Sequence, residues 1–278
     1  MDSLIFDSPE MQKPRVTPNS PIIFDSHAHY DDRAFDSDRE AVLAALPDAG
    51  VCGVINCGVD ILSSQKALAL ATQYPFLWAA VGIHGQEAGR ARPDDLNQLL
   101  PLLEEPRTVA LGEIGLDYHY DDGAPRDVQR ELLERQLAIA VERDVPVILH
   151  DREAHEDMWK LLQRYKPRGV MHCFSGSVEM ARDLVGLGMY IGLGGAVTFK
   201  NARRPIEVAA WVPADRLLIE TDAPYMTPAP FRGKRNSSAL IPYTAEKIAQ
   251  VRGMTAEQIL RITKENTERL FVCTAVRR

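Results

Sequence analysis

Short apolar runs alternate along this chain with longer segments of mixed character. Runs of about four to eight mostly apolar residues are typical of strands buried on both faces, whereas apolar residues about three to four positions apart are typical of helices. The runs lie within residues 22–29, 51–59, 76–84, 108–118, 145–151, 168–176, 189–197 and 216–224. The sequence therefore predicts eight strands.

The segments between the runs carry helix signals. In one of them, apolar residues recur at Val128, Leu132, Leu133, Leu137 and Val141. Ser37 and Glu40 have the spacing of a capping box, in which each side chain bonds the other residue's free backbone N–H. Thr255 and Gln258 have the same spacing. We therefore expect helices between the strands, which makes the sheet parallel.

Eight strand-helix units over about 250 residues predict a closed (β/α)₈ TIM barrel. An open doubly wound sheet is the rival, but no Gly-rich phosphate loop follows the first run in this sequence. We expect residues 21–278 to form a single barrel domain. Residues 1–20 contain three prolines and no apolar periodicity, so we expect them to form a flexible extension.

The composition excludes several classes of protein. Hydrophobic residues make up 45% of the chain and charged residues 26%, which argues against disorder and against a coiled coil. No apolar stretch reaches the roughly 18 residues of a membrane span, so we expect no membrane association. An acidic start and only four cysteines predict a cytoplasmic protein. The net charge of −7 argues against non-specific coating of long duplex DNA but permits local contact with nucleic acid.

The ends of the predicted strands are rich in residues that bind metals. The active site of a barrel forms at the C-terminal ends of its strands, so these positions are the ones to inspect. Five of the seven histidines lie there. The complete set of strand-end candidates is His27, His29, His84, Glu113, His150, His172 and Asp222.

His27 and His29 are two positions apart, so in a strand both rings point to the same side and can share one metal ion. Asp25 lies on that face too and is a candidate acceptor for the other ring nitrogen of a ligating histidine. Asp222 and Glu220 are likewise expected to share one strand face. A carboxylate such as Glu113 is costly to bury in a barrel mouth unless it is paired or binds a cation.

Nitrogen and carboxylate ligands without a thiolate favour Zn²⁺, Mn²⁺ or a similar divalent ion. Six ligands, the candidates without His84, are too many for one tetrahedral ion with an open position, so we expect two ions that share a bridging carboxylate. Two such ions lower the pKa of a bound water and stabilise the attacking and leaving oxygens. The predicted reaction class is hydrolysis.

The series DSHAH, GIH, GEIGLDY, VILHDREA, HCFSG and IETDAPYMTPAPFRGKRN resembles the TatD family of metal-dependent deoxyribonucleases, which belong to the amidohydrolase superfamily. The resemblance extends from about residue 22 to NTERLF, which ends at Phe271. It implies a barrel that hydrolyses DNA phosphodiester bonds with two divalent ions, Mg²⁺, Mn²⁺ or Zn²⁺. The implied substrate is single-stranded DNA or a 3′ end.

The resemblance also implies a role for each ligand. His27 and His29 would bind one ion, and Asp222 would hold that ion and act as general base. Glu113 would bridge the two ions. The second ion would be bound by His150 and His172.

Substrate contacts follow from the same resemblance and from position in the chain. His84 and Arg152 are expected near the substrate phosphate. Lys234 and Arg235, in FRGKRN, follow the last strand, where the phosphates of a bound strand could pass. Tyr118 and Tyr225 adjoin the site motifs, and we regard both as candidates to stack on a base.

The sequence departs from the usual family pattern at two loops. Gly85 stands where proline commonly follows GIH, and Ser237 and Ser238 stand where Glu-Pro commonly follows RGKRN. These differences affect substrate preference more than metal binding. Two alternatives remain open: an esterase or deacylase that uses the same two-metal site, and a non-catalytic barrel that binds metal or a protein partner.

Overall fold

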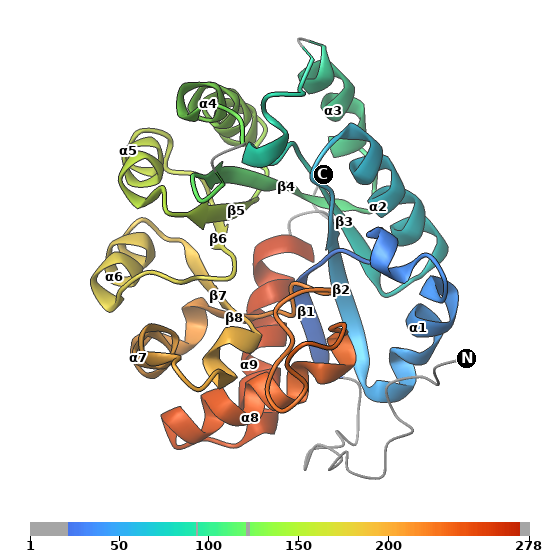
Figure 1. Cartoon of the computed structure of the whole chain (residues 1–278), viewed down its shortest axis with the longest axis vertical. Coiled ribbons are helices and arrows are strands. Elements are labelled where there is room, and N and C mark those ends of the chain that lie inside the picture. Colours follow the sequence, from blue (N-terminus) through green and yellow to red (C-terminus); the bar gives the residue numbers. More distant parts are fainter. Residues whose placement is uncertain (1–21, 93, 121–122, 273–278) are drawn as a thin grey trace.

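The computed structural model describes residues 22–92, 94–120 and 123–272, and the predicted extension over residues 1–20 lies outside this part (Figure 1). Eight parallel strands pair in chain order within the described residues, and helices surround them. This is the predicted TIM barrel, and the open-sheet rival is wrong. The strands are β1 (Ile23–Ala28), β2 (Val51–Cys57), β3 (Leu77–Val81), β4 (Thr108–Asp117), β5 (Val147–Arg152), β6 (Gly169–Met171), β7 (Tyr190–Leu193) and β8 (Leu217–Ile219).

Helices follow the strands on the outside of the barrel. They are α1 (Arg39–Ala45), α2 (Ile61–Gln73), α3 (Asp95–Leu103), α4 (Arg126–Glu142), α5 (His155–Tyr165), α6 (Val178–Gly186), α7 (Arg203–Trp211), α8 (Ile241–Arg252) and α9 (Ala256–Thr267). Short helical turns lie between these elements: η1 (Arg33–Phe35), η2 (Pro47–Ala49), η3 (Gly85–Glu87), η4 (Gly195–Thr198), η5 (Ala214–Arg216), η6 (Ser238–Leu240) and η7 (Glu268–Val272).

The barrel closes between β1 and the segment after β8. Ala28 forms a parallel bridge with Ala223, and the N–H of His29 donates to the carbonyl of Ala223 at 2.7 Å. The N–H of Asp222 donates to the carbonyl of His27 at 2.9 Å. Closure therefore fixes Asp222 beside the two histidines at the end of β1.

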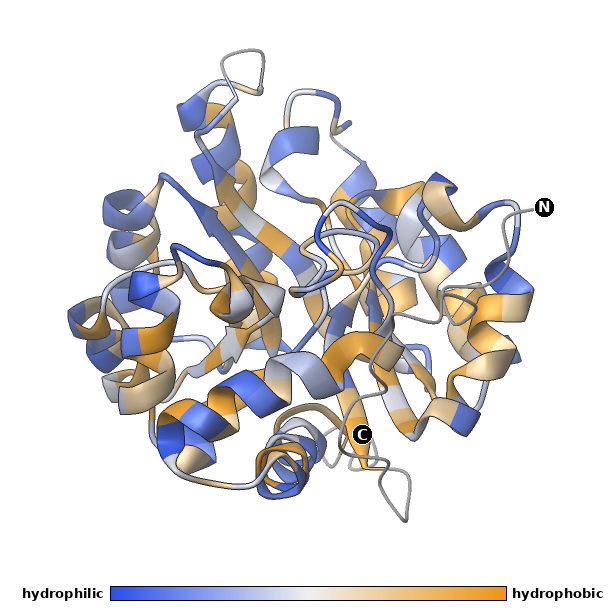
Figure 2. Ribbon diagram, turned by 60° about the horizontal axis from the view of Figure 1, so that its bottom comes forward, coloured by the Kyte–Doolittle hydropathy of each residue, from blue (hydrophilic) through white to orange (hydrophobic). Residues whose placement is uncertain are grey.

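Two apolar layers hold the fold together. One fills the barrel interior with residues from all eight strands and is covered by Leu270 and Phe271 of η7. The other lies between the strands and the helices. Figure 2 shows the matching hydropathy, with apolar positions concentrated on the strands and on the inner sides of the helices. Burial on both faces explains why the strands read as continuous apolar runs.

The helix signals in the sequence agree only in part with the observed helices. The Thr255–Gln258 capping box is present at the start of α9, as predicted. The Ser37–Glu40 box is wrong, because α1 begins at Arg39 and no side chain caps it. Helix α4 covers the predicted apolar stripe, but Val128 and Val141 are exposed at its edge.

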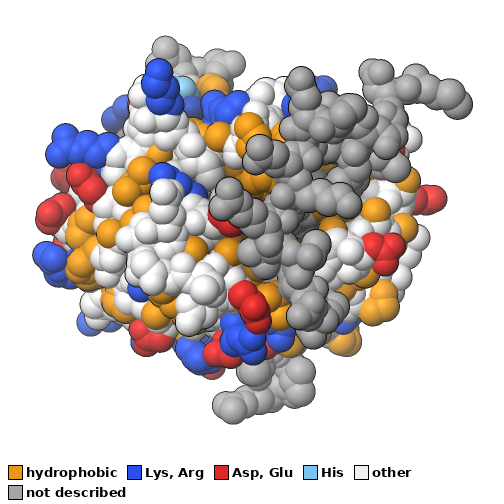
Figure 3. All heavy atoms as spheres, turned by 90° about the horizontal axis from the view of Figure 1, so that it is seen from below, with side chains coloured by type: hydrophobic (Ala, Val, Ile, Leu, Met, Phe, Trp, Pro, Cys, Tyr) orange, Lys and Arg blue, Asp and Glu red, His pale blue; other side chains and the backbone are white. Residues whose placement is uncertain are grey.

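The described part of the chain contains no helix that is long and apolar enough to cross a membrane. On the face shown in Figure 3, acidic and basic side chains are interspersed.

Candidate metal centre

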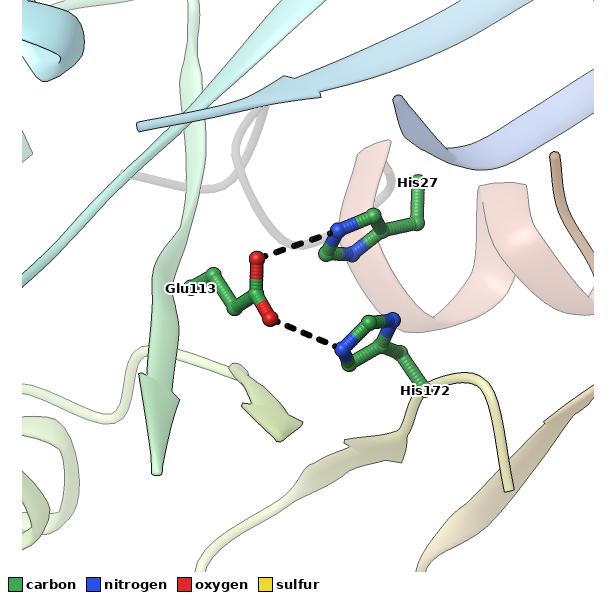
Figure 4. Close-up of side chains that lie close together, drawn as sticks. All are labelled: His27, Glu113 and His172. Atoms are coloured by element: carbon green, nitrogen blue, oxygen red, sulfur yellow. Dashed lines mark ion pairs between the residues drawn. The ribbon is translucent and has the colours of Figure 1, made fainter. Parts of the chain in front are cut away.

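Glu113 lies at the centre of the cluster and faces two pairs of histidines. Its Oε2 atom is 3.3 Å from the Nε2 atoms of both His27 and His29. Its Oε1 atom is 2.8 Å from Nε2 of His172 and 3.0 Å from Nδ1 of His150. Figure 4 shows the two oxygens directed to different histidines, His27 and His172. The carboxylate therefore has the placement of a bridge between two cation sites.

Asp222 joins the first histidine pair. Its Oδ1 atom is 3.5 Å from Nε2 of His29 and 3.7 Å from Nε2 of His27. Because β8 ends at Ile219, Asp222 lies in the following loop and has a positive φ of 58°. The expectation that Asp222 and Glu220 share a strand face is wrong, because the chain has left the strand before both residues.

Within each pair, the histidine nitrogens converge. Nε2 of His27 and Nε2 of His29 are 3.0 Å apart, and Nδ1 of His150 and Nε2 of His172 are 3.2 Å apart. Two nitrogens that bind one tetrahedral ion at about 2.0–2.1 Å lie about 3.3 Å apart. The donor set and its spacing therefore fit divalent cations.

The other nitrogen of several rings has a hydrogen-bond acceptor outside the cluster. Nδ1 of His29 lies 2.8 Å from the carbonyl of Cys57, and Nε2 of His150 lies 3.3 Å from Oδ2 of Asp117. A proton on the outer nitrogen leaves the inner one with a free lone pair for a metal. Nδ1 of His172 lies 3.6 Å from Oε1 of Glu220, which is completely buried.

Contrary to the prediction, the carboxylate of Asp25 does not bond a histidine ring. Its carboxylate instead accepts from the hydroxyls of Thr221 and Ser238, each at 2.6 Å, and from the backbone N–H of Thr221. Asp25 thus ties β1 to the segments after β8. Ser238, one of the departures from the family pattern, supplies one of these bonds.

Opposing effects set the protonation of the cluster. Burial alone would raise the pKa of Glu113, but the charges of His172 and His27 outweigh burial and hold this pKa well below its usual range. Burial lowers the pKa of His172, yet the carboxylates of Glu113 and Glu220 raise it well above normal. The net pKa of His29 is also raised, by Asp222 and Glu113, despite burial. The carboxylates therefore favour positive charge inside the cluster.

His84 could be counted as a further ligand, because its ring nitrogen falls within 4.8 Å of ligand atoms of Glu113 and His150. Its hydrogen bonds argue otherwise. The backbone N–H of Gln86 donates to Nδ1 of His84 at 3.1 Å, and burial, with the nearby His150, lowers the pKa of His84 to about 3. The neutral ring must then carry its proton on Nε2. His84 is therefore placed as a hydrogen-bond donor.

A cavity of about 500 Å³ opens over the cluster. Its wall includes His84 and Arg152, as expected for substrate contacts, but neither Lys234 nor Arg235. Arg235 forms an ion pair with Asp38 at 2.6 Å, so it ties a loop to the start of α1. The contacts of Lys234 and Arg235 with substrate stay predictions.

The tyrosines at the site differ from the sequence prediction. Tyr225 lines the cavity, but Tyr118 does not appear in its wall. The hydroxyl of Tyr118 donates to Asp157 at 2.9 Å, and the guanidinium of Arg126 lies over its ring, 4.6 Å from the centroid. Tyr120, two residues further on, occupies the wall instead.

Sequence reasoning also missed two buried glutamines of α4. The side chain of Gln136 accepts from the N–H of Ile83 and donates to its carbonyl, each at 2.9 Å. Gln129 makes the same pair of contacts with Asp117. These paired hydrogen bonds fix the backbone at Ile83, next to His84, and at Asp117, whose carboxylate lies beside His150. Their signal was available: two glutamines seven residues apart on the apolar stripe of one helix.

Comparison with known proteins gives the site a context. The family model "TatD related DNase" matches residues 24–272. An uncharacterised metal-dependent hydrolase, YabD, of Bacillus subtilis is 42% identical over 253 residues, which are 90% of this chain and 99% of that protein. The 3′-5′ ssDNA/RNA exonuclease TatD of Salmonella typhimurium is 35% identical over 259 residues, covering 90% and 98% of the two chains.

A solved structure agrees with these relatives. The crystal structure of YJJV, a TatD homologue of Escherichia coli, superposes with a TM-score of 0.85 at 35% identity and covers 91% of this chain and 98% of that one. The family model spans nearly all described residues, including the whole candidate metal centre. The chain therefore belongs to the TatD-related DNase family and is a metal-dependent hydrolase.

Proposed function

We propose that this protein is a 3′-5′ exonuclease that hydrolyses single-stranded DNA with two divalent ions. The observation that carries the proposal is the placement of Glu113, whose two oxygens face two separate histidine pairs. The Salmonella relative, whose name states this activity, supports the substrate and the polarity.

The residues divide into two ligand groups. Glu113 would contribute one oxygen to each ion, Mg²⁺, Mn²⁺ or Zn²⁺. The first ion would be held by His27, His29 and Asp222, and the second by His150 and His172. When bound, such ions activate water and offset the charge that develops on the phosphate.

The chain's own groups would complete the reaction. Asp222 would act as the general base. The neighbouring histidines hold its pKa below the usual value in spite of burial, so its carboxylate is ionised. Nε2–H of His84 would donate to a phosphate oxygen without adding a further charge. Arg152, at the cavity wall, would attract the negative backbone of the substrate.

An esterase or deacylase would use the same cluster. Related amidohydrolases often place a modified lysine at the fourth strand, where this chain has Glu113. A carboxylate there and the cationic Arg152 at the wall favour a phosphodiester over a neutral amide.

Oligonucleotides labelled at the 5′ end test the proposal. With Mg²⁺, Mn²⁺ or Zn²⁺, the protein should shorten a single strand one nucleotide at a time from its 3′ end, and a chelator should stop the reaction. A 3′-phosphorothioate strand serves as a blocked control. Cleavage of ester or amide substrates, with no cleavage of DNA under any metal, would refute the proposal in favour of the alternative.

A further inference from the structure

We infer that Tyr120 and Tyr225 form a nucleobase-binding pair that faces across the mouth of the cavity. The inference rests on the proposed nuclease function and deepens it, because it states how an unpaired strand is recognised. Both tyrosines line the cavity over the metal centre.

These two side chains are unusually exposed to solvent for aromatic residues. Tyr120 is 47% exposed and Tyr225 is 53% exposed, and they are the two aromatic residues among the large, strongly exposed apolar side chains of the described chain. Aromatic rings usually bury most of their surface in the core. Here both remain accessible at the same opening, where a planar partner can cover them.

The two tyrosines follow strands on opposite sides of the barrel. Tyr120 follows the end of β4 at Asp117 by three residues, and Tyr225 follows the end of β8 at Ile219 by six. Strands β4 and β8 are four positions apart in a barrel of eight, so they lie across from each other (Figure 1). A strand bound in the cavity would then have one tyrosine on each side.

Tyr225 is held in position before any substrate arrives. Its hydroxyl donates to Oδ2 of Asp32 at 2.9 Å, and its backbone N–H donates to the carbonyl of Asp222 at 2.8 Å. Its ring centroid lies 6.5 Å from that of His29. A base stacked on Tyr225 would therefore belong to a nucleotide whose phosphate reaches the metal centre.

Tyr120 contacts the guanidinium of Arg152. Nη1 of Arg152 donates to its hydroxyl at 3.3 Å, and the guanidinium lies 5.2 Å from the ring centroid. The ring of His119 packs edge-on at 5.0 Å. An aromatic face beside a guanidinium matches the chemistry of one nucleotide, which presents a base and a phosphate side by side.

This arrangement selects for single strands. In a duplex each base is already stacked and paired, so it cannot cover a ring of the protein. Stacking does not depend on which base is present, so the pair would give little sequence preference. The tyrosines thus explain how a protein with net negative charge can hold a flexible nucleic acid.

Binding can be measured without catalysis. A short oligonucleotide with 2-aminopurine as its terminal or penultimate base is titrated with protein in the presence of chelator, and stacking is read as fluorescence quenching. Tyr225→Leu and Tyr120→Leu should each weaken binding by about tenfold and reduce the quenching. Tyr225→Phe keeps the ring and should retain the quenching. Leu62→Ala, at an exposed site away from the cavity, is the matched control.

A second arm uses cleavage. The wild type should cleave a normal strand with about tenfold higher kcat/KM than a strand with abasic residues at its last two positions. The leucine variants should lose this preference and cleave both strands alike. Unchanged quenching and an unchanged preference in both variants would overturn the inference. A wild type that quenches through these tyrosines but cleaves no DNA would instead overturn the proposed function.

Discussion

The Oε1 atom of Glu220 lies 3.6 Å from Nδ1 of His172. Among the described residues, neither that nitrogen nor Oε2 of Glu220 has a hydrogen-bond partner, although both atoms are buried. Buried polar atoms of this kind are rare and need an explanation. We expect the carboxylate of Glu220 to orient the His172 ring by charge, so that its Nε2 atom faces Glu113.

Glu220→Ala should therefore weaken binding of the second ion. Loss of such an outer partner typically lowers metal affinity by about 10–100-fold. Calorimetric titration with Mn²⁺ would show the weaker of two binding steps shifted while the other stays. Glu40→Gln, on an exposed surface, controls for loss of charge. Two unaltered binding steps in Glu220→Ala would show that Glu220 does not act through His172.

The His84→Gln variant tests whether His84 donates a hydrogen bond to the substrate or binds a metal ion. We expect Nε2–H of His84 to donate to the substrate, so the variant should keep its full metal content and lose about 10- to 100-fold in kcat. Metal content is measured by elemental analysis of the dialysed protein, and kcat by oligonucleotide cleavage. Loss of an ion along with activity would make His84 a ligand instead.

Metal binding should strengthen as pH rises. The pKa values of His29, His150 and His172 are raised, so these rings tend to hold protons that an ion must displace. Because these pKa values lie above the ordinary histidine value of 6.5, affinity should already fall as pH decreases through the range above 6.5, and binding near neutral pH should release protons. Calorimetry in two buffers of different ionisation enthalpy counts these protons. A proton count of zero, or affinity independent of pH, would contradict the assigned directions.

Gln136→Leu should destabilise the barrel by about 2 kcal/mol, because it leaves the N–H and the carbonyl of Ile83 buried without partners. Urea unfolding followed by circular dichroism measures the free energy of unfolding. Gln65→Leu, at an exposed position of α2, is the comparison variant. Equal free energies of unfolding for the two variants would show that the hydrogen bonds between Gln136 and Ile83 do not stabilise the barrel.

The sequence was sufficient for the parts of the site that depend on strand periodicity and strand ends. His27 and His29 converge as predicted, although β1 ends at Ala28 and only His27 lies within the strand. Glu113 could be placed because β4 is a long buried run. The loops were harder. Asp222 and Glu220 lie beyond β8, where alternation no longer predicts direction.

Contacts between distant segments escaped prediction for a different reason. The apolar stripe of α4 marks Gln129 and Gln136 as buried, but no local pattern specifies that they bond the backbone of Asp117 and Ile83. Arg235 belongs to a basic loop, and its ion pair with Asp38, almost two hundred residues earlier, could not be predicted from that loop. The predicted cytoplasmic location and the extension over residues 1–20 stay predictions.

The bridging role of Glu113 is the claim on which the whole account depends. Electron paramagnetic resonance of the Mn²⁺-loaded protein tests it most directly, because neighbouring ions that share a ligand couple magnetically. The account predicts two Mn²⁺ per chain with a coupled spectrum in the wild type, and loss of that coupling in a folded Glu113→Gln variant. A single ion per chain, two uncoupled ions, or a coupled pair that persists in Glu113→Gln would contradict it.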